Sequence, residues 1–519
     1  MIKFKIDNKE VEVEEGTTIL QAAQKLGIQI PTMCYKGGHQ NHPSCMVCLV
    51  KDAQSGKLIP SCCFPALNGM EIISLDDEIK EARKEALELL LSDHAGDCEA
   101  PCQIACPANM NIPLMNRLIA QGKFDEAIKV VKEDIALPLI LGYICSAPCE
   151  KACHRNEIDG TIAICQLKKF VARDDTSANG FYLPEKQKNS GKKIAVIGSG
   201  PAGLAAAFYS LKNGHHVTIF EKENQIGGTL QDVSEEILPQ YILKKELGLI
   251  QQYGAELILN AEVDNTFFAK NIQNKFDAII LSTGEIKNNT GNYFDIVTDK
   301  NGIAADQKTF ETSIEGIFAC GSIVKNINMA IRALAQGKEA AKSANEFLHN
   351  KKPSGSFRMF NSKYGKFLKE EFYEFFKEAS TDNHHEPKNG KLEGFTKEEA
   401  IKEAKRCLHC DCRKPETCKL RLLSDEYQAD RRKYMLVERR AIHKHMQHEF
   451  VVYEPNKCIK CNLCVDIANK HGETVGLTNI GRGFNVQIAV PFHETIKEAL
   501  TVAAIECVES CPTGALAYK

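Results

Sequence analysis

Apolar and polar residues alternate along the first fifteen positions of the chain. The stretches "IKFKID" and "EVEVEE" follow a period of two and are separated by "NK", so they predict a β-hairpin. In the next stretch, "GTTILQAAQKLG", apolar residues recur at helical spacing, with Thr17 or Thr18 as the N-cap and Gly27 as the stop. Residues 1–78 are therefore predicted to form a small β-rich domain with one helix.

Helical spacing then dominates, before a strand–turn–helix–strand pattern begins. The stretches "DDEIKEARKEALELLLSD" and "IPLMNRLIAQGKFDEAIKVV" predict an α-helical domain over residues 79–185. The stretch "KKIAVIGSGPAGLAAAFYSLKNGHHVTIFE" opens an α/β domain over residues 190–350. Three further segments are predicted: a helix and linker (351–395), a capped helix leading into cysteines (396–430) and a C-terminal domain (431–519). The fold class is multidomain α+β and α/β.

Two histidine-rich stretches carry no periodic signal for a site. "ASTDNHHEPKNGKLEG" contains several turn formers and is expected to be a polar linker in which His384 and His385 are solvated. "VERRAIHKHMQHEF" is basic and is expected to present a solvated helix face. The Phe-rich stretch "YGKFLKEEFYEFFKE" is expected to be an ordinary packed helix.

Composition excludes several classes of function. The 519 residues suggest three to five domains, and the net charge of −3 points neither to nucleic acid nor to an anionic membrane. The N-terminus lacks the basic and apolar regions of a signal peptide. The longest apolar run, 135–144, is shorter than the ~20 residues of a membrane helix. A soluble cytoplasmic protein is therefore expected.

Cysteine content is the unusual feature, with 22 cysteines in the chain. In a cytosolic protein, clustered cysteines favour metal ligation over disulfides. Nineteen of them fall into short-spaced groups, whereas Cys63, Cys320 and Cys507 do not fit a ligand role.

The first group is spaced C-x10-C-x2-C-x13-C and contains Cys34, Cys45, Cys48 and Cys62. This spacing, with "IPTMCY", "CMVCLV" and "IPSCC" around it, resembles the N-terminal [2Fe–2S] domain of the iron–sulfur input subunit of complex I and of [FeFe]-hydrogenases. The resemblance implies a β-grasp fold and one [2Fe–2S] cluster. Four free core thiols are the alternative.

The second group lies in "CQIACPANMNIP" and "LGYICSAPCEKACHRNEIDGTIAI", which resemble the two-[4Fe–4S] domain of glutamate synthase small subunits and dihydropyrimidine dehydrogenase. Its members are Cys98, Cys102, Cys106, Cys145, Cys149, Cys153 and Cys165. The family carries C-x2-C-x4-C-x3-C in the first segment, but this chain has C-x3-C-x3-C, so seven cysteines serve eight places.

The family's interleaved pattern implies a partition of these cysteines. It groups Cys98 and Cys102 with Cys153, and Cys106 with Cys145 and Cys149; Cys165 stands near the place where that family uses a Gln or Glu. The same region resembles the "LLSNH…DC" segment of the complex I subunit, in which a histidine four residues before the first cysteine ligates iron. His94 stands at that distance from Cys98 and is predicted to be a ligand, with a solvated histidine as the alternative.

The glycines of "IGSGPAG" complete a dinucleotide-binding fingerprint. Gly198 makes the tight turn, Gly200 admits the pyrophosphate and Gly203 allows helix–strand packing. Glu221 closes the second strand, where an acid bonds ribose hydroxyls. With "IGGTL", "AIILSTG" and "EGIFACGS", this region resembles the FAD domain of two-dinucleotide-fold flavoproteins. The resemblance implies FAD contacts at Gly228, Gly284, Gly321 and Ser322.

Two departures from that flavoprotein family stand out. Only 31 residues separate Gly284 from Gly316, too few for the family's NAD(P)H-binding insert, since a βαβ unit takes more than ~30 residues. A nicotinamide site is therefore expected to be absent. In addition, the family's "GD" near the flavin is "GS" here, which removes a carboxylate at Ser322.

Two more cysteine groups lie near the C-terminus. "EAKRCLHCDC" resembles the cluster segment trailing such flavoproteins and follows a helix capped by Thr396. It predicts one [4Fe–4S] site, with a zinc site as the alternative, whose ligands are Cys407, Cys410, Cys412 and Cys418. "CIKCNLCVDIA" and "CVESCPTGAL" resemble the bacterial-type ferredoxin module of the complex I subunit. There one [4Fe–4S] set is complete, in Cys458, Cys461, Cys464 and Cys511, whereas Ala468, Thr501 and Ala504 replace ligands of a second cluster.

Together these features predict an electron-transfer subunit with one [2Fe–2S] cluster, up to four [4Fe–4S] clusters and FAD, and no catalytic residue of its own. The resemblances imply a soluble NAD(H)-linked complex in which partners are a complex I-type FMN/NAD subunit, a small [2Fe–2S] subunit, and ferredoxin or another acceptor. One alternative is a self-contained NAD(P)H oxidoreductase such as a glutamate synthase small subunit. The other is a scaffold with vestigial clusters.

Overall fold

A computed structural model describes residues 1–175, 181–286, 293–355, 358–435 and 439–519. The chain divides into two compact units, each built from discontinuous segments. Unit 1 comprises Met1–Glu99, Met359–Glu378 and Cys410–Lys519, and unit 2 comprises Ala100–Arg358 and Ala379–His409. The predicted cysteine segment 396–430 is thus divided after His409.

The N-terminal part of unit 1 is a five-stranded sheet covered by one helix. Its strand order is β2-β1-β5-β3-β4, with β1 and β5 parallel. Asp7 and Asn8 have φ values of 48° and 64°, the left-handed pair that a two-residue hairpin requires. Thr18 caps the helix and forms a capping box with Gln21. The elements are β1 (Ile2–Ile6), β2 (Lys9–Val13), α1 (Ile19–Lys25), β3 (Leu49–Asp52), β4 (Leu58–Pro60) and β5 (Glu71–Ile73). The predicted hairpin and helix are confirmed.

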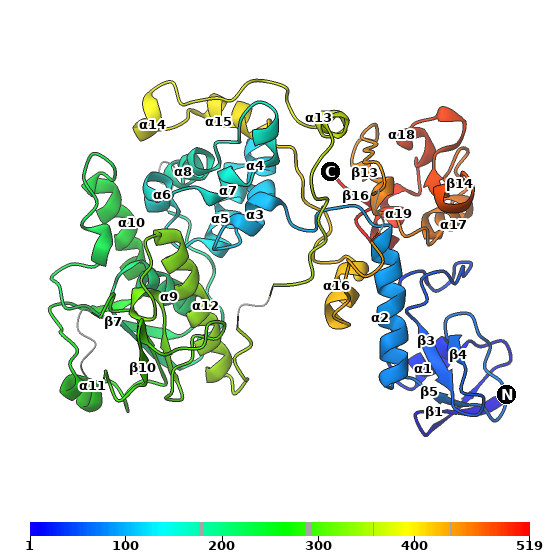
Figure 1. Ribbon diagram of the computed structural model, residues 1–519, viewed down its shortest axis with the longest axis horizontal. Coiled ribbons are helices and arrows are strands. Elements are labelled where there is room, and N and C mark those ends of the chain that lie inside the picture. The colour runs from blue at the N-terminus through cyan, green and yellow to red at the C-terminus, as the bar shows by residue number, and fades with distance from the viewer. Residues whose placement is uncertain (176–180, 287–292, 356–357, 436–438) are drawn as a thin grey trace. The chain divides into compact units, whose positions relative to one another are not determined.

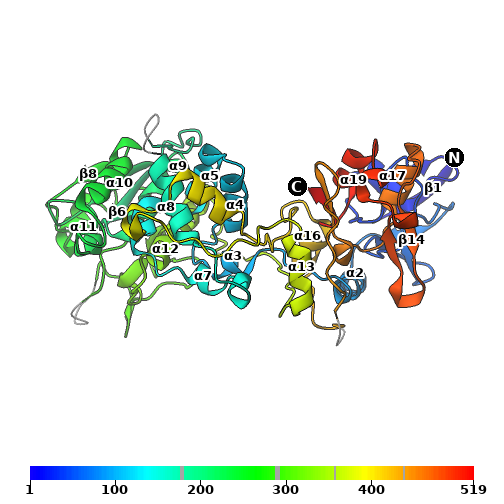
Figure 2. The ribbon, with the colours of Figure 1, turned by 90° about the horizontal axis from the view of Figure 1, so that it is seen from above.

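The C-terminal part of unit 1 consists of short strand pairs and helices. Helices α17 and α19 lie side by side against the pair formed by β13 and β16 (Figure 1, Figure 2). Helix α2 carries α16 along its side. The elements are α2 (Asp77–Ser92), α13 (Phe372–Phe376), α16 (Lys419–Glu426), β13 (Val451–Tyr453), α17 (Leu463–Lys470), β14 (Thr478–Ile480), β15 (Gln487–Ala489), α18 (Ile496–Ala499), α19 (Ala504–Ser510) and β16 (Leu516–Tyr518).

The predicted solvated helix in "VERRAIHKHMQHEF" is wrong for its described part, residues 439–450. These residues form no helix, and Lys444 and His448 are buried. His448 Nε2 lies 2.9 Å from the carbonyl oxygen of Leu500, so the segment covers the C-terminal part of unit 1. The first residues of the stretch lie outside the described part of the chain.

Unit 2 begins with a helical layer whose helices are short because prolines start four of them. Helix α15 packs on α4 and α8, and Thr396 forms the predicted capping box with Glu399. The elements are α3 (Pro101–Ala105), α4 (Ile112–Ala120), α5 (Phe124–Asp134), α6 (Pro138–Ile144), α7 (Pro148–Lys151), α8 (Ile164–Asp174), α14 (Gly390–Glu393) and α15 (Lys397–Ala404).

The rest of unit 2 is a doubly wound α/β fold around a parallel sheet of order β12-β9-β6-β7-β8. The central strands are buried along nearly their whole length, as expected for a sheet covered on both faces (Figure 1). The elements are β6 (Lys193–Ile197), α9 (Pro201–Lys212), β7 (His216–Phe220), α10 (Gln240–Gln252), β8 (Glu256–Ile258), α11 (Asn265–Asn271), β9 (Ala278–Leu281), β10 (Thr298–Asp299), β11 (Gly302–Ile303), β12 (Ile317–Ala319) and α12 (Ala330–Leu348).

Across all the residues described, we find no helix with both the length and the apolar character needed to span a membrane.

Candidate metal centres and nucleotide site

The four cysteines of the first group converge in unit 1. The Sγ atoms of Cys34 and Cys45 lie 3.4 Å apart, and Cys62 hydrogen-bonds to both Cys34 and Cys48. Bonds from the Cys45 and Cys62 thiols lower the pKa of Cys34, which favours the thiolate that binds metal. Cys63 instead donates to the carbonyl of Pro60 at 3.6 Å, as expected of a bystander.

Four thiols also converge in unit 2, around one cavity. Cys106, Cys145, Cys149 and Cys165 line it together with apolar side chains and Ile331 of α12. Cys165 hydrogen-bonds to Cys145 and lowers its pKa to about 5. The structure therefore places a fourth thiol where the resembling family was expected to use Gln or Glu.

A buried lysine accompanies this thiol set, and the sequence reasoning missed it. Lys168 is 4% exposed. Burial lowers the pKa of Lys168, but the negative charge of Cys165 and the three other thiols raises it above the usual value overall. Lys168 follows Cys165 by three positions in α8 and so shares its helix face, which is a signal available in the sequence.

The C-terminal cysteines form another set in unit 1. Cys458, Cys461, Cys464 and Cys511 line one cavity, and burial raises the pKa of Cys458, Cys461 and Cys464. Two of the three replaced ligand places, Ala468 and Ala504, lie in an apolar core with Leu477, Ile496 and Cys507, whereas Thr501 is exposed.

Two of the predicted ligand sets are divided between the two units. Cys98 lies in unit 1, whereas Cys102 and Cys153 lie in unit 2. Cys407 likewise lies in unit 2, whereas Cys412 and Cys418 lie in unit 1. The boundaries between the units follow Glu99 and His409.

Within unit 1, Cys98 contacts the segment that contains Cys412 and Cys418. The backbone N–H of Cys412 donates to the carbonyl of Cys98 at 3.2 Å. Burial, with a smaller contribution from the neighbouring Cys412 thiol, raises the pKa of Cys98 to about 11. Burial, with smaller contributions from the Cys412 and Cys98 thiols, raises the pKa of Cys418 to about 12.

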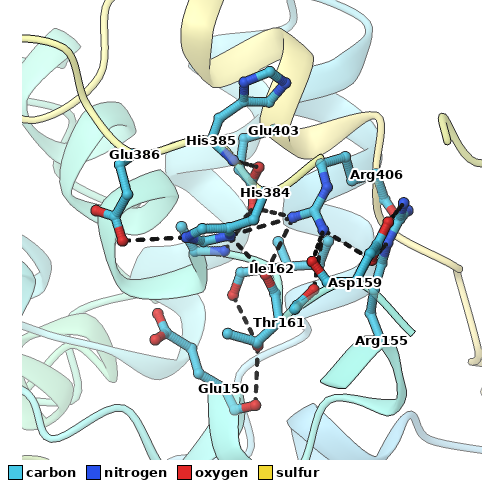
Figure 3. A network of polar contacts seen from close by, with 12 residues as sticks. Glu150, Arg155, Asp159, Thr161, Ile162, His384, His385, Glu386, Glu403 and Arg406 are labelled. Atoms are coloured by element: carbon cyan, nitrogen blue, oxygen red, sulfur yellow. Dashed lines mark hydrogen bonds and ion pairs between the residues drawn. The ribbon is translucent and has the colours of Figure 1, made fainter. Parts of the chain in front are cut away.

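A buried polar network orders the part of unit 2 that contains Cys153 and Cys407 (Figure 3). The guanidinium of Arg406 contacts Glu403 at 2.8 Å and Asp159 at 3.1 Å, and the neighbouring Arg155 donates to the Arg406 carbonyl. Arg406 and Glu403 have no exposed surface. The network therefore fixes the chain next to both cysteines.

The two linker histidines take part in this network, so the prediction that they are solvated is wrong. His384 Nδ1 lies 2.9 Å from the carbonyl oxygen of Thr161, and the backbone N–H of His385 donates to Glu403 at 3.0 Å (Figure 3). The buried Glu403 carboxylate accounts for this arrangement, because a buried carboxylate needs hydrogen-bond donors.

The fingerprint glycines have the geometry that their predicted roles require. A Cβ at Gly198 would lie 2.6 Å from the Ser282 carbonyl oxygen, and one at Gly203 would lie 2.0 Å from the Gly198 carbonyl oxygen. Gly200 has open space in front of it, as a pyrophosphate requires. Glu221 Oε2 accepts the Ser199 N–H at 2.9 Å, so the acid reaches this turn.

The other predicted flavin contacts surround the same turn. A Cβ at Gly228 would lie 2.9 Å from Gly200 Cα, and one at Gly321 would lie 2.9 Å from the Ala202 side chain. Gly284 has φ +86° and open space around it, and Ser322 Oγ accepts the Ile327 N–H at 3.3 Å. These residues fit a dinucleotide, since they leave room at the N-terminus of α9.

The described residues between Gly284 and Gly316 contain the β10–β11 hairpin and no βαβ unit. Over the described ranges, no three Cys, His, Asp or Glu side chains converge tightly enough for a single metal ion. A cluster differs because each thiolate binds its own iron, so its ligands lie farther apart than those of one zinc ion.

Three family models match parts of the chain. A 2Fe-2S iron-sulfur cluster binding domain matches residues 1–76, a dihydropyrimidine dehydrogenase domain II with a 4Fe-4S cluster matches 76–180, and a pyridine nucleotide-disulphide oxidoreductase domain matches 157–337. These matches confirm the predicted [2Fe–2S], [4Fe–4S] and flavin cofactors.

Curated relatives share about a third of their residues with the matched part. The NADPH-Fe(3+) oxidoreductase subunit beta of Geobacter sulfurreducens is 32% identical over 36% of this chain and 28% of its own length. The NADP(+)-dependent formate dehydrogenase subunit beta of Moorella thermoacetica is 34% identical over 36% and 29%. The glutamate synthase [NADPH] small chain of Bacillus subtilis is 34% identical over 37% and 41%. The chain thus spans less than half the length of each of these relatives, and it combines iron–sulfur and flavoprotein domains of the oxidoreductase class.

Proposed function

We propose that the chain is an electron-transfer subunit of a soluble NAD(H)-linked oxidoreductase complex. It relays single electrons between a partner that carries flavin and the nicotinamide site and an acceptor such as ferredoxin. When bound, the clusters carry one electron each and the flavin carries two, which it can release singly. The protein's own part is to hold these groups near one another and to exclude water.

One observation carries this proposal: thiols of separate sets share one apolar core in unit 1. Cys34 and Cys45 of the N-terminal set pack in the same core as Cys461 of the C-terminal set, with Leu87 and Ile459 beside them. Cys34 also contributes to raising the pKa of Cys461, after burial and the thiols of its own set. Such packing supports short electron transfer between the two sites.

The loop around the N-terminal set is fixed on the C-terminal helices by charged contacts. His39 Nδ1 lies 3.0 Å from Asp466 on α17, and its Nε2 lies 3.2 Å from Glu506 on α19. Lys36 forms an ion pair with Glu506 and donates to Ser510 at 2.8 Å. The His39 side chain is 3% exposed, whereas those of Lys36 and Glu506 are 34% and 32% exposed.

A similar arrangement in unit 2 supports a link between the flavin fold and the thiol set. Ile331, which lines the cavity of Cys106, Cys145, Cys149 and Cys165, belongs to α12. The same helix packs tightly on α9, since a Cβ at Gly337 would lie 2.0 Å from the Ala202 carbonyl oxygen. Helix α12 therefore contacts both the thiol cavity and helix α9 of the nucleotide site.

Anaerobic purification followed by reduction tests the proposal. We expect the isolated chain to contain iron and flavin, to be reduced by dithionite, and to remain oxidised with NADH or NADPH. Reduction by NADPH without a partner would instead favour a self-contained oxidoreductase of the glutamate synthase type. A chain with neither iron nor flavin would favour a scaffold.

A further inference from the structure

One ring nitrogen of the His94 imidazole, Nδ1, is buried and has no hydrogen-bond partner among the described residues. A ring nitrogen of a neutral imidazole offers a lone pair that can bind a metal. A buried polar atom without a partner calls for a ligand or a functional role.

Three thiols from two distant segments meet near this histidine. Cys98 and Ser362 exchange contacts, with the Cys98 N–H donating to the Ser362 carbonyl at 3.3 Å and the Ser362 N–H donating to the Cys98 Sγ at 3.4 Å. The Cys412 N–H donates to the Cys98 carbonyl at 3.2 Å. Cys418 is the N-cap of α16, and Arg421 of the same helix pairs at 2.5 Å with Glu99, the residue after Cys98. All three side chains are buried.

Lys457 places His94 in the same neighbourhood as these thiols. His94 hydrogen-bonds to the backbone of Lys457, and the Lys457 side chain passes over Gly96, whose Cβ would lie 3.1 Å from Lys457 Cε. The positive charge of the Lys457 ammonium lowers the pKa of both the Cys98 and the Cys412 thiol. The same ammonium pairs with the Glu454 carboxylate at 2.5 Å. A metal-bound histidine commonly uses its second ring nitrogen to bond a backbone carbonyl, which this surrounding can supply.

We propose that His94, Cys98, Cys412 and Cys418 ligate one [4Fe–4S] cluster in unit 1, built from segments more than 300 residues apart in the sequence. This site rests on the proposed electron-transfer function and replaces the ligand sets that the spacing predicted. Cys418 shares the apolar core of Cys34 and Cys461, which makes the new site the third member of the relay in unit 1. The cysteines then left without an assigned site are Cys102, Cys153, Cys407 and Cys410.

A double-variant iron count distinguishes the two partitions. If Cys98 and Cys412 serve one cluster, Cys98→Ser, Cys412→Ser and the double variant each lose the same four irons per chain, about four in every case. If they serve separate clusters, the double variant loses about eight irons, and the proposal is overturned. Cys106→Ser with Cys412→Ser is the additive control, because those residues lie in different units. Cys507→Ser should keep all iron.

The role of His94 is tested in a variant that keeps the cluster. His94→Cys replaces a neutral ligand with a thiolate, so the EPR signal that Cys98→Ser abolishes should persist with a more negative midpoint potential. His443→Cys, at an imidazole 54% exposed in the same unit, should leave that potential unchanged. An unchanged potential in His94→Cys would overturn ligation by His94, and this result stands even if the serine variants fail to fold. A wild-type chain without iron would instead refute the proposed function itself.

Discussion

Substitution of Arg406 by methionine is the sharpest perturbation of unit 2. The Arg406 guanidinium donates to Glu403 and Asp159 and to the carbonyls of Thr161 and Gly160 at 3.1 and 3.0 Å. Methionine preserves much of the buried volume but removes every donor. The change leaves the carboxylate of Glu403, which has no exposed surface, without its cation.

The size of the effect follows from what Glu403 keeps. Removing one partner of a buried ion pair costs about 3–5 kcal/mol. Glu403 still accepts the Ala163 and His385 N–H groups at 2.9 and 3.0 Å, which places the loss near the lower end, at about 3 kcal/mol. Unit 2 has about 290 residues and an unfolding entropy of about 0.6 kcal/mol/K, so its Tm should fall by about 5 °C.

Differential scanning calorimetry measures this shift. The matched control is Lys391→Met, which breaks an exposed pair with Glu386 in the same unit, with side chains 76% and 57% exposed. Surface pairs contribute about 0–1 kcal/mol, so the control should lower the Tm by less than about 2 °C. Equal Tm values for the two variants would refute the stabilising role of the network.

Three further predictions concern unit 2. Gly200→Ala should fold normally but bind FAD at least about tenfold more weakly. Gly203→Ala should also lose stability, because of the two positions only Gly203 lacks room for a Cβ. Flavin fluorescence measures the binding of FAD, and the Tm measures the stability. Burial raises the pKa of Glu246 to about 7, so its contribution to stability is present below pH 4.5 and is lost as the pH rises through 7. Glu246→Gln should therefore gain about 3 kcal/mol over wild type between pH 5 and pH 8, and a pH-independent difference would contradict this. Lys168→Met removes a positive charge beside four thiols and should lower the midpoint potential of that cluster by on the order of 50 mV in a redox titration, given ~1 kcal/mol per charge interaction; an unchanged potential would contradict it.

The sequence predicted the parts of the fold that depend on local pattern. The hairpin at Asp7 and Asn8, the caps at Thr18 and Thr396 and the glycine fingerprint all follow from neighbouring residues, because turns, caps and tight packing have short-range causes. The convergence of Cys34 with its three partners could be anticipated for the same reason.

The partition of the remaining ligands could not be predicted from spacing. Cys98 and Cys102 are close in sequence, but the boundary between the two units falls between them, at Ala100. Buried Lys457 was also missed, because a lysine without a visible partner is normally expected at the surface. Its partner Glu454 lies three residues earlier, but the burial of the pair depends on distant segments.

The proximity of the N-terminal and C-terminal sites of unit 1 is tested most directly by EPR spectroscopy of the fully reduced chain. Because Cys34 and Cys461 share one apolar core, we predict that the [2Fe–2S] signal is broadened by a neighbouring reduced cluster. The same signal should sharpen in Cys461→Ser, which removes a ligand of that neighbour. A [2Fe–2S] signal that is equally narrow in wild type and in Cys461→Ser would contradict a relay through this core.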